Sequence, residues 1–135
     1  SKLQDLIEVR ACLISFSGKL AAKRITDEEL DRMKELVEEI AASNDPKTIM
    51  QLDLKIHSLV NKATRNASLT KMLNFLEDQT SRIWSFSPER NAYYKTLEFE
   101  LGELYQALKE RDEEKSAKIL EDHLANFVEF VSNNR

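Results

Sequence analysis

Glycine and proline are scarce in this chain, with only two residues of each among 135. So little turn punctuation argues against a β-rich fold and favours long helices. No apolar run approaches the roughly 20 residues needed to span a membrane, and the N-terminus does not resemble a signal peptide. A single cysteine, Cys12, excludes an internal disulfide and favours a reducing, cytoplasmic location.

An excess of positive charge is also missing. The net charge is −4, and lysines and arginines are scattered among acidic residues along every segment. A protein that neutralises many phosphates needs a basic stripe or patch, and this chain has none. We therefore do not expect the chain alone to bind nucleic acid. Its length fits a single domain over residues 1–135.

Apolar residues recur at helical spacing in six segments. The predicted helices cover 3–24, 27–42, 46–64, a segment from about Leu69 to Trp84, about 88–110, and a last segment from Asp112 to Val131. A capping box at Thr26–Glu29 and cap-plus-proline signals at Asp45–Pro46 and Ser87–Pro88 separate several of them. Short connections between long helices predict an all-α antiparallel bundle.

The third predicted helix carries an unusual pair, Asp53 and His57. Residues four apart project from the same side of a helix, and this side falls within a wide apolar arc. Burying ionisable groups without partners costs several kcal/mol, so we expect a partner for the pair. The second of the two histidines, His123, also faces inward on the last predicted helix.

Asp53, His57 and His123 together offer three ligands for zinc, nickel or a similar divalent ion. The residues alone leave a second interpretation open, in which the pair is a buried structural contact. Nothing supports nucleophilic catalysis, because the chain lacks a Gly-rich loop and a serine elbow. No further acid is expected to face inward as a general base.

Arg10 lies on the apolar side of the first predicted helix. Either its stem covers apolar surface while its head reaches water, or it binds an anion in an internal pocket. Cys12 is expected to pack in or near the core. The same is expected of six aromatic residues, Phe75, Trp84, Phe86, Tyr94, Phe127 and Phe130.

Asp53-x-x-x-His57, followed by Asn66, resembles the D-x-x-F-H…N signature of the FCD effector-binding domain of GntR-type transcription regulators. Ile56 stands where that family often has Phe. Further segments similar to the family pattern are Glu8-Val-Arg10, Leu20-Ala-Ala22, Ala107-Leu108 with Asp112 and Ala117, and His123-Leu124. The resemblance extends over essentially the whole chain, in order.

The resemblance implies a helical bundle around an internal pocket for a small effector, commonly a carboxylate. In many relatives one Asp and three His hold a divalent metal there, and Asp53, His57 and His123 match three of these positions. The fourth position is Leu101, which cannot bind metal. Three possibilities follow: a three-ligand site completed by water or effector, replacement by Tyr105 or another acid, or loss of the metal.

Residues implied in effector binding are Arg10, Asn66, Arg82 and Tyr105. Family members carry a winged-helix DNA-binding domain before this one, and this chain is expected to be without it, either as a fragment of a longer regulator or as a stand-alone sensor domain. We therefore expect the ligand-sensing and dimerisation domain of a cytoplasmic homodimeric regulator, with DNA bound only through the missing domain and no membrane contact. The alternatives are a metal-dependent enzyme that uses the same pocket and a purely structural helical interaction domain.

Overall fold

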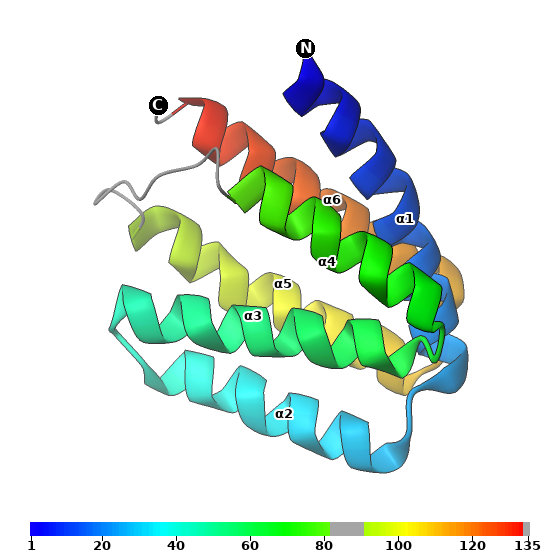
Figure 1. The fold of residues 1–135 in the computed structure, drawn as a ribbon. Coiled ribbons are helices and arrows are strands. Elements are labelled where there is room, and N and C mark those ends of the chain that lie inside the picture. Colours follow the sequence, from blue (N-terminus) through cyan, green and yellow to red (C-terminus); the bar gives the residue numbers. More distant parts are fainter. Residues whose placement is uncertain (82–90, 134–135) are drawn as a thin grey trace.

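Six helices make up the part of the chain that the structure, a computed structural model, describes, namely residues 1–81 and 91–133 (Figure 1). They are α1 (Lys2–Arg24), α2 (Asp27–Ala42), α3 (Pro46–Ala63), α4 (Ala67–Ser81), α5 (Asn91–Lys109) and α6 (Glu113–Asn133). Within these ranges there is no strand, so the predicted all-α bundle is confirmed. The predicted punctuation at Ser87–Pro88 lies outside the described residues.

Local capping explains where several helices begin. Thr26 and Glu29 form the predicted capping box at the start of α2, and Pro46 is the first residue of α3. Asp112 accepts a hydrogen bond from the backbone N–H of Lys115 at 3.0 Å, so it caps α6. These signals are local in the sequence, which is why the helix boundaries follow them closely.

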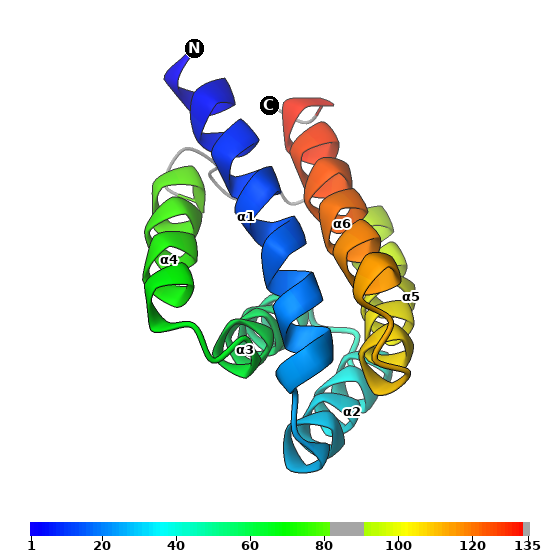
Figure 2. The same cartoon turned by 90° about the vertical axis from the view of Figure 1, so that its right-hand side faces the viewer.

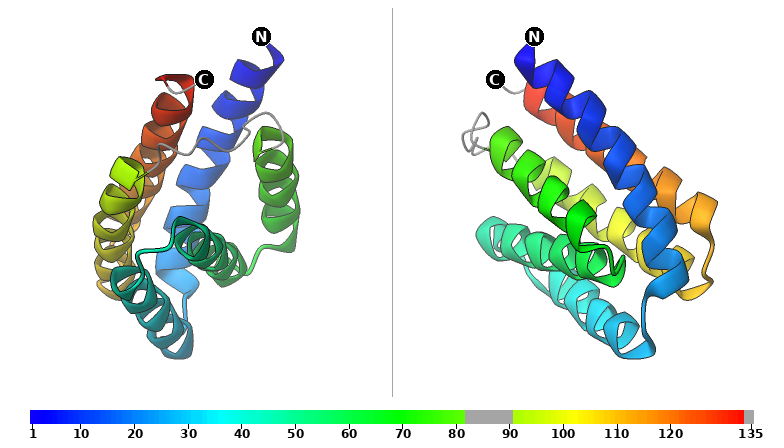
Figure 3. Two further views of the ribbon diagram at one scale, coloured as in Figure 1. Left: turned by 90° about the vertical axis from the view of Figure 1, so that its left-hand side faces the viewer. Right: turned by 45° about the vertical axis from the view of Figure 1, so that its right-hand side comes forward.

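The most extensive packing joins α1 and α6, which run antiparallel, so that the start of α1 and the end of α6 lie at one end of the bundle (Figure 3). α1 lies between α6 and α4 (Figure 2), while α2 packs against α3 and α5. Gly18 permits the close approach of α1 to α6, because a Cβ atom there would lie 2.9 Å from the Cα of Ala117. Buried leucines, isoleucines and alanines from all six helices fill the interior.

Three arginines, Arg24, Arg65 and Arg111, bind backbone carbonyls where the α1–α2, α3–α4 and α5–α6 connections meet. We call them the arginine clamp. Arg111 donates to the carbonyls of Ile25 at 2.6 Å and Ala22 at 3.3 Å. Arg24 donates to Thr64 at 2.8 Å, and Arg65 donates to the carbonyl of Arg24 at 2.9 Å. The clamp thus satisfies carbonyls at the C-terminal end of α1 that its own helix leaves open.

Two predictions about the core were wrong. Cys12 is exposed, and the side chain of Phe75 is 59% exposed on α4. Both lie on helix faces that point away from the neighbouring helices, alongside exposed Val9, Phe16 and Met72. Tyr94 is buried as predicted, whereas Trp84 and Phe86 lie outside the described residues. None of the described helices has the length and apolar character needed to cross a membrane.

Candidate metal and effector site

Asp53 and His57 lie one turn apart on α3, as the sequence predicts. Ile56 and Val60 bury the apolar face of this helix and so turn the Asp53–His57 edge toward α6. The side chains of Asp53 and His57 are only 17% and 13% exposed, and His57 Nε2 lies 3.1 Å from Asp53 Oδ1. Two ionisable groups are therefore held together in a largely dry environment.

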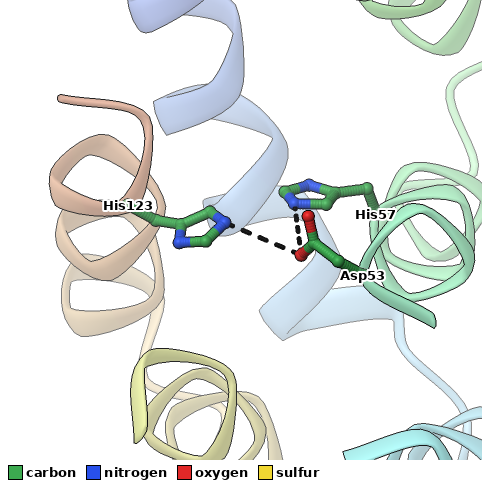
Figure 4. A group of neighbouring side chains, drawn as sticks. All are labelled: Asp53, His57 and His123. Carbon is green, nitrogen blue, oxygen red and sulfur yellow. Dashed lines mark ion pairs between the residues drawn. The ribbon is translucent and has the colours of Figure 1, made fainter. Parts of the chain in front are cut away.

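His123 joins this pair from α6 (Figure 4). Its Nε2 atom lies 3.8 Å from Asp53 Oδ1, and its side chain is only 7% exposed. The rings of His57 and His123 are stacked, with centroids 5.2 Å apart and planes 24° apart. One ligand atom from each of Asp53, His57 and His123 lies within 4.8 Å of the other two. The three residues that sequence analysis singled out as metal ligands therefore converge.

Asp53 Oδ1 is the atom toward which the two histidines converge, yet it is buried and accepts no hydrogen bond from any described residue. A buried carboxylate oxygen without a donor is costly, and native proteins rarely keep one without a reason. Burial acts to raise the pKa of Asp53, but the charge of His57 and the contacts with His123 and His57 hold it well below its usual range. The carboxylate is therefore held in its ionised form.

Two of the three spacings between the donor atoms are close to the spacing expected around a divalent metal. Two ligand atoms bound tetrahedrally at about 2.1 Å from zinc lie roughly 3.4 Å apart. The 3.1 Å and 3.8 Å distances from Asp53 Oδ1 to the two imidazole nitrogens fall on either side of this value. One carboxylate and two imidazoles suit zinc or nickel and leave at least one coordination position open.

A fourth residue, Glu100, was missed by sequence analysis, which expected no further inward acid. Its Oε2 atom is hydrogen-bonded to Nδ1 of His123, and its Oε1 atom accepts a 3.0 Å hydrogen bond from Nδ2 of Asn126. Burial acts to lower the pKa of His123, but the contacts with Asp53 and Glu100 raise it to about 9. The sequence signal that could have identified Glu100 is its position on α5, directly before Leu101, which the resemblance aligns with a metal-binding histidine.

Leu101, which the resemblance aligns with a metal-binding histidine, is 1% exposed and packs in the apolar core. Tyr105, one turn further along α5, is half-buried against the same core. Among the described histidine, cysteine and acidic residues, the cluster of possible metal ligands contains Asp53, His57 and His123. Glu100, the acid next to Leu101 in the sequence, contacts His123.

The residues predicted to bind effector are spread over the bundle. Arg10 on α1 is half-buried and donates a 3.0 Å hydrogen bond from Nη1 to Thr80 Oγ1 on α4. Asn66 caps α4, because its Oδ1 atom accepts from the backbone N–H of Leu69 at 3.0 Å. Arg82 lies outside the described residues. The effector-binding roles of Arg10, Asn66, Arg82 and Tyr105 remain predictions.

Residues 5–126 match the FCD domain family. This match covers most of the chain. The chain belongs to the FCD domain family. Asp53, His57 and His123 all fall within the matched range.

Two solved structures share the fold of this FCD domain. Streptococcus agalactiae GntR superimposes with a TM-score of 0.74 at 23% identity, over 93% of this chain and 57% of that one. E. coli McbR/YncC superimposes with a TM-score of 0.81 at 17% identity, over 98% of this chain and 69% of that one. The FCD domain thus spans little more than half the length of the streptococcal structure. A search of curated proteins found no match.

Proposed function

We propose that this FCD domain is the effector-sensing and dimerisation domain of a GntR-type transcription regulator in the cytoplasm. It binds a small carboxylate together with a divalent metal, zinc or nickel, held by Asp53, His57 and His123. The observation that carries the proposal is Asp53 Oδ1, a buried acceptor that faces two imidazole nitrogens without a hydrogen bond. A metal bound there would supply an open coordination position for a carboxylate oxygen.

Arg10 is the proposed second contact for the effector. Its guanidinium presents a planar fork that suits a carboxylate, and its bond to Thr80 links α1 to α4. An effector held by Arg10 on one side and by the α3–α6 cluster on the other would favour one packing of these helices. Such a shift requires that the effector binds one arrangement better than the other. DNA would be bound through a separate winged-helix domain, whose spacing in the dimer would follow this shift.

Catalysis is not part of this proposal. A metal-dependent hydrolase needs a general base beside the metal, and Glu100 is the acid that approaches the cluster. Both of its carboxylate oxygens already have partners, one in His123 and one in Asn126. This arrangement supports binding rather than turnover.

Metal content and carboxylate binding test the proposal together. We expect the purified domain to retain about one zinc or nickel per chain and to melt at a lower temperature after treatment with EDTA. Lactate, malate and citrate serve as probes in calorimetric titrations of the metal-loaded and the stripped protein, and at least one should bind the loaded form more tightly. Absence of both metal and carboxylate binding would contradict the proposal.

Replacement of His57 tests whether this residue, and not α3 in general, is needed for binding. His57→Ala is expected to abolish binding of the metal and of the carboxylate probe. Ser58→Ala, an exposed neighbour on the same helix, is the matched control and should leave both unchanged. If His57→Ala binds metal and carboxylate normally, the residues of the site are wrongly assigned.

A second copy of the chain is the proposed partner for the exposed apolar side chains of α1 and α4. Val9 and Phe16 are 51% and 46% exposed on α1, and Met72 and Phe75 are 55% and 59% exposed on the adjacent α4. Phe75→Glu should convert a dimer to a monomer in analytical ultracentrifugation. Phe99→Glu is the control, because Phe99 is 70% exposed on α5, and that variant should remain dimeric.

A further inference from the structure

Glu100 approaches the metal-ligand cluster from α5, on the side opposite to Asp53. Its Oε2 atom bonds to Nδ1 of His123, while the other ring nitrogen of His123, Nε2, faces Asp53 Oδ1 at 3.8 Å. The side chain of Glu100 is only 15% exposed, so the contact is largely shielded from water. Glu100 therefore contacts the ring edge that faces away from the cluster and cannot itself be a ligand of the same ion through that contact.

This contact decides which nitrogen of His123 is available to a metal. When a metal displaces one ring proton of His123, a carboxylate at Nδ1 keeps the remaining proton on that nitrogen. The lone pair is then on Nε2, the atom that faces Asp53 and His57. Carboxylates that hydrogen-bond to the non-ligating nitrogen of a histidine in this way orient the ring and strengthen its binding to metal.

Asn126 fixes Glu100 in this position. It lies one turn after His123 on α6, and its Nδ2 atom donates to Oε1 of Glu100 at 3.0 Å. Both oxygens of one carboxylate on α5 are thus bound by residues three apart on α6. The carboxylate cannot turn away from Nδ1 of His123 without breaking the bond to Asn126.

We infer that Glu100 is a positioning residue that holds His123 with Nε2 toward a divalent metal. This inference rests on the proposed function, because it assumes that Asp53, His57 and His123 bind the ion. Leu101 removes one ligand that the family pattern provides, so affinity depends more strongly on how the remaining three are oriented. Glu100 also brings a second carboxylate close to the ion, which balances the two positive charges together with Asp53.

Glu100→Gln tests the inference, because the amide keeps the shape of the side chain and removes its charge. We expect Zn²⁺ affinity, measured by competition with a chromophoric chelator, to fall by about 10- to 100-fold. Glu98→Gln, an exposed acid on the same helix, is the matched control and should bind Zn²⁺ like the unmodified domain. Asn126→Ala should cause a smaller loss than Glu100→Gln, in the same direction.

A purely structural role for Glu100 would alter the melting temperature of the metal-free protein and leave Zn²⁺ affinity unchanged. Nitrogen-15 NMR of the zinc-loaded domain provides a second readout, with Nε2 of His123 bound to metal and Nδ1 protonated. Unchanged Zn²⁺ affinity in Glu100→Gln, or coordination through Nδ1, would overturn this inference and leave the proposed function standing. Failure of the unmodified domain to bind Zn²⁺ or Ni²⁺ would overturn the inference together with the metal part of the proposed function.

Discussion

The arginine clamp and the cluster of Asp53, His57 and His123 are two polar regions in a largely apolar bundle, and they differ in how their hydrogen bonds are satisfied. In the clamp, Arg111 and Arg24 donate to backbone carbonyls at 2.6 Å and 2.8 Å. In the cluster, Asp53 Oδ1 accepts no hydrogen bond from the described residues, although two imidazole nitrogens face it. The clamp's polar groups satisfy the backbone and stabilise the fold, whereas the buried Asp53 oxygen is the feature on which the proposed metal site rests.

The two regions also differ in energetic cost. Charged groups taken out of water are stabilising only when their geometry and hydrogen bonds are good. In the clamp, the side chains of Arg65 and Arg111 are 45% and 41% exposed, so these two arginines lose little hydration. The side chain of His123 is only 7% exposed. A metal bound to the cluster, as proposed, would stabilise the folded state further, because it would bind the folded chain and not the unfolded one.

Leu101→His is the substitution expected to have the largest effect on stability. The substitution removes a side chain that is 1% exposed in the core and buries an imidazole in its place. We expect the metal-free variant to lose about 2–4 kcal/mol in the free energy of unfolding, measured with urea in EDTA. Zinc should restore part of this loss, because the family pattern has a metal-binding histidine at this position.

Leu54→His is the control for this experiment, since Leu54 lies on α3 and is 57% exposed. It should unfold like the unmodified domain with and without zinc. Unchanged stability of Leu101→His in EDTA would show that Leu101 is not packed as the structure has it. A loss that zinc does not reverse would show that this position does not face the cluster in this chain.

Arg111→Met tests the clamp. Methionine keeps much of the apolar stem but removes the donors to the carbonyls of Ile25 and Ala22. Because the side chain of Arg111 is 41% exposed, we expect a loss of only about 1 kcal/mol in the free energy of unfolding. Zn²⁺ affinity should not change. A large loss of Zn²⁺ affinity would contradict the separation of a structural region from a binding region.

Arg32→Met is the matched control for the clamp. Arg32 forms an exposed ion pair with Glu35 at 3.0 Å, three residues along α2. Pairs of this kind contribute less than about 0.5 kcal/mol. Equal losses in Arg32→Met and Arg111→Met would show that the carbonyl contacts of the clamp add nothing to stability.

Most of the fold could be predicted from the sequence, because its signals are local. The capping box at Thr26–Glu29 and the proline at position 46 lie at the start of α2 and α3, and apolar spacing identifies the buried face of each helix. Exposure of Phe75 could not be predicted this way, because hydrophobicity alone does not reveal which apolar side chains a bundle leaves uncovered.

The convergence of Asp53, His57 and His123 could be predicted because Asp53 and His57 are four residues apart and His123 is the one remaining histidine. Glu100 could not, since its partner is 23 residues away on another helix. Helical periodicity places an acid at the edge of a helix face but does not show which neighbouring helix that edge meets. The carbonyl contacts of the arginine clamp were unpredictable for the same reason.

Glu29 offers the smallest and most specific test, the dependence of clamp stability on pH. Burial acts to raise the pKa of Glu29, but hydrogen bonds from Thr26 and Arg65 outweigh this and hold it below its usual 4.5. Since the ionised form stabilises the fold, its contribution is complete above pH 4.5 and is lost as the pH falls through the lower folded value. We expect Glu29→Gln to cost less than about 1 kcal/mol at pH 7.

The cost of Glu29→Gln should shrink as urea unfolding is repeated from pH 7 down to pH 3, because the glutamate then becomes neutral as well. Glutamine can still complete the capping box with Thr26, so the variant isolates the ion pair between Glu29 and Arg65, whose atoms are 2.9 Å apart. Glu28→Gln, an exposed neighbour, should show no such trend. A difference that stays constant with pH would mean that shape, not charge, fixes Arg65 in the clamp.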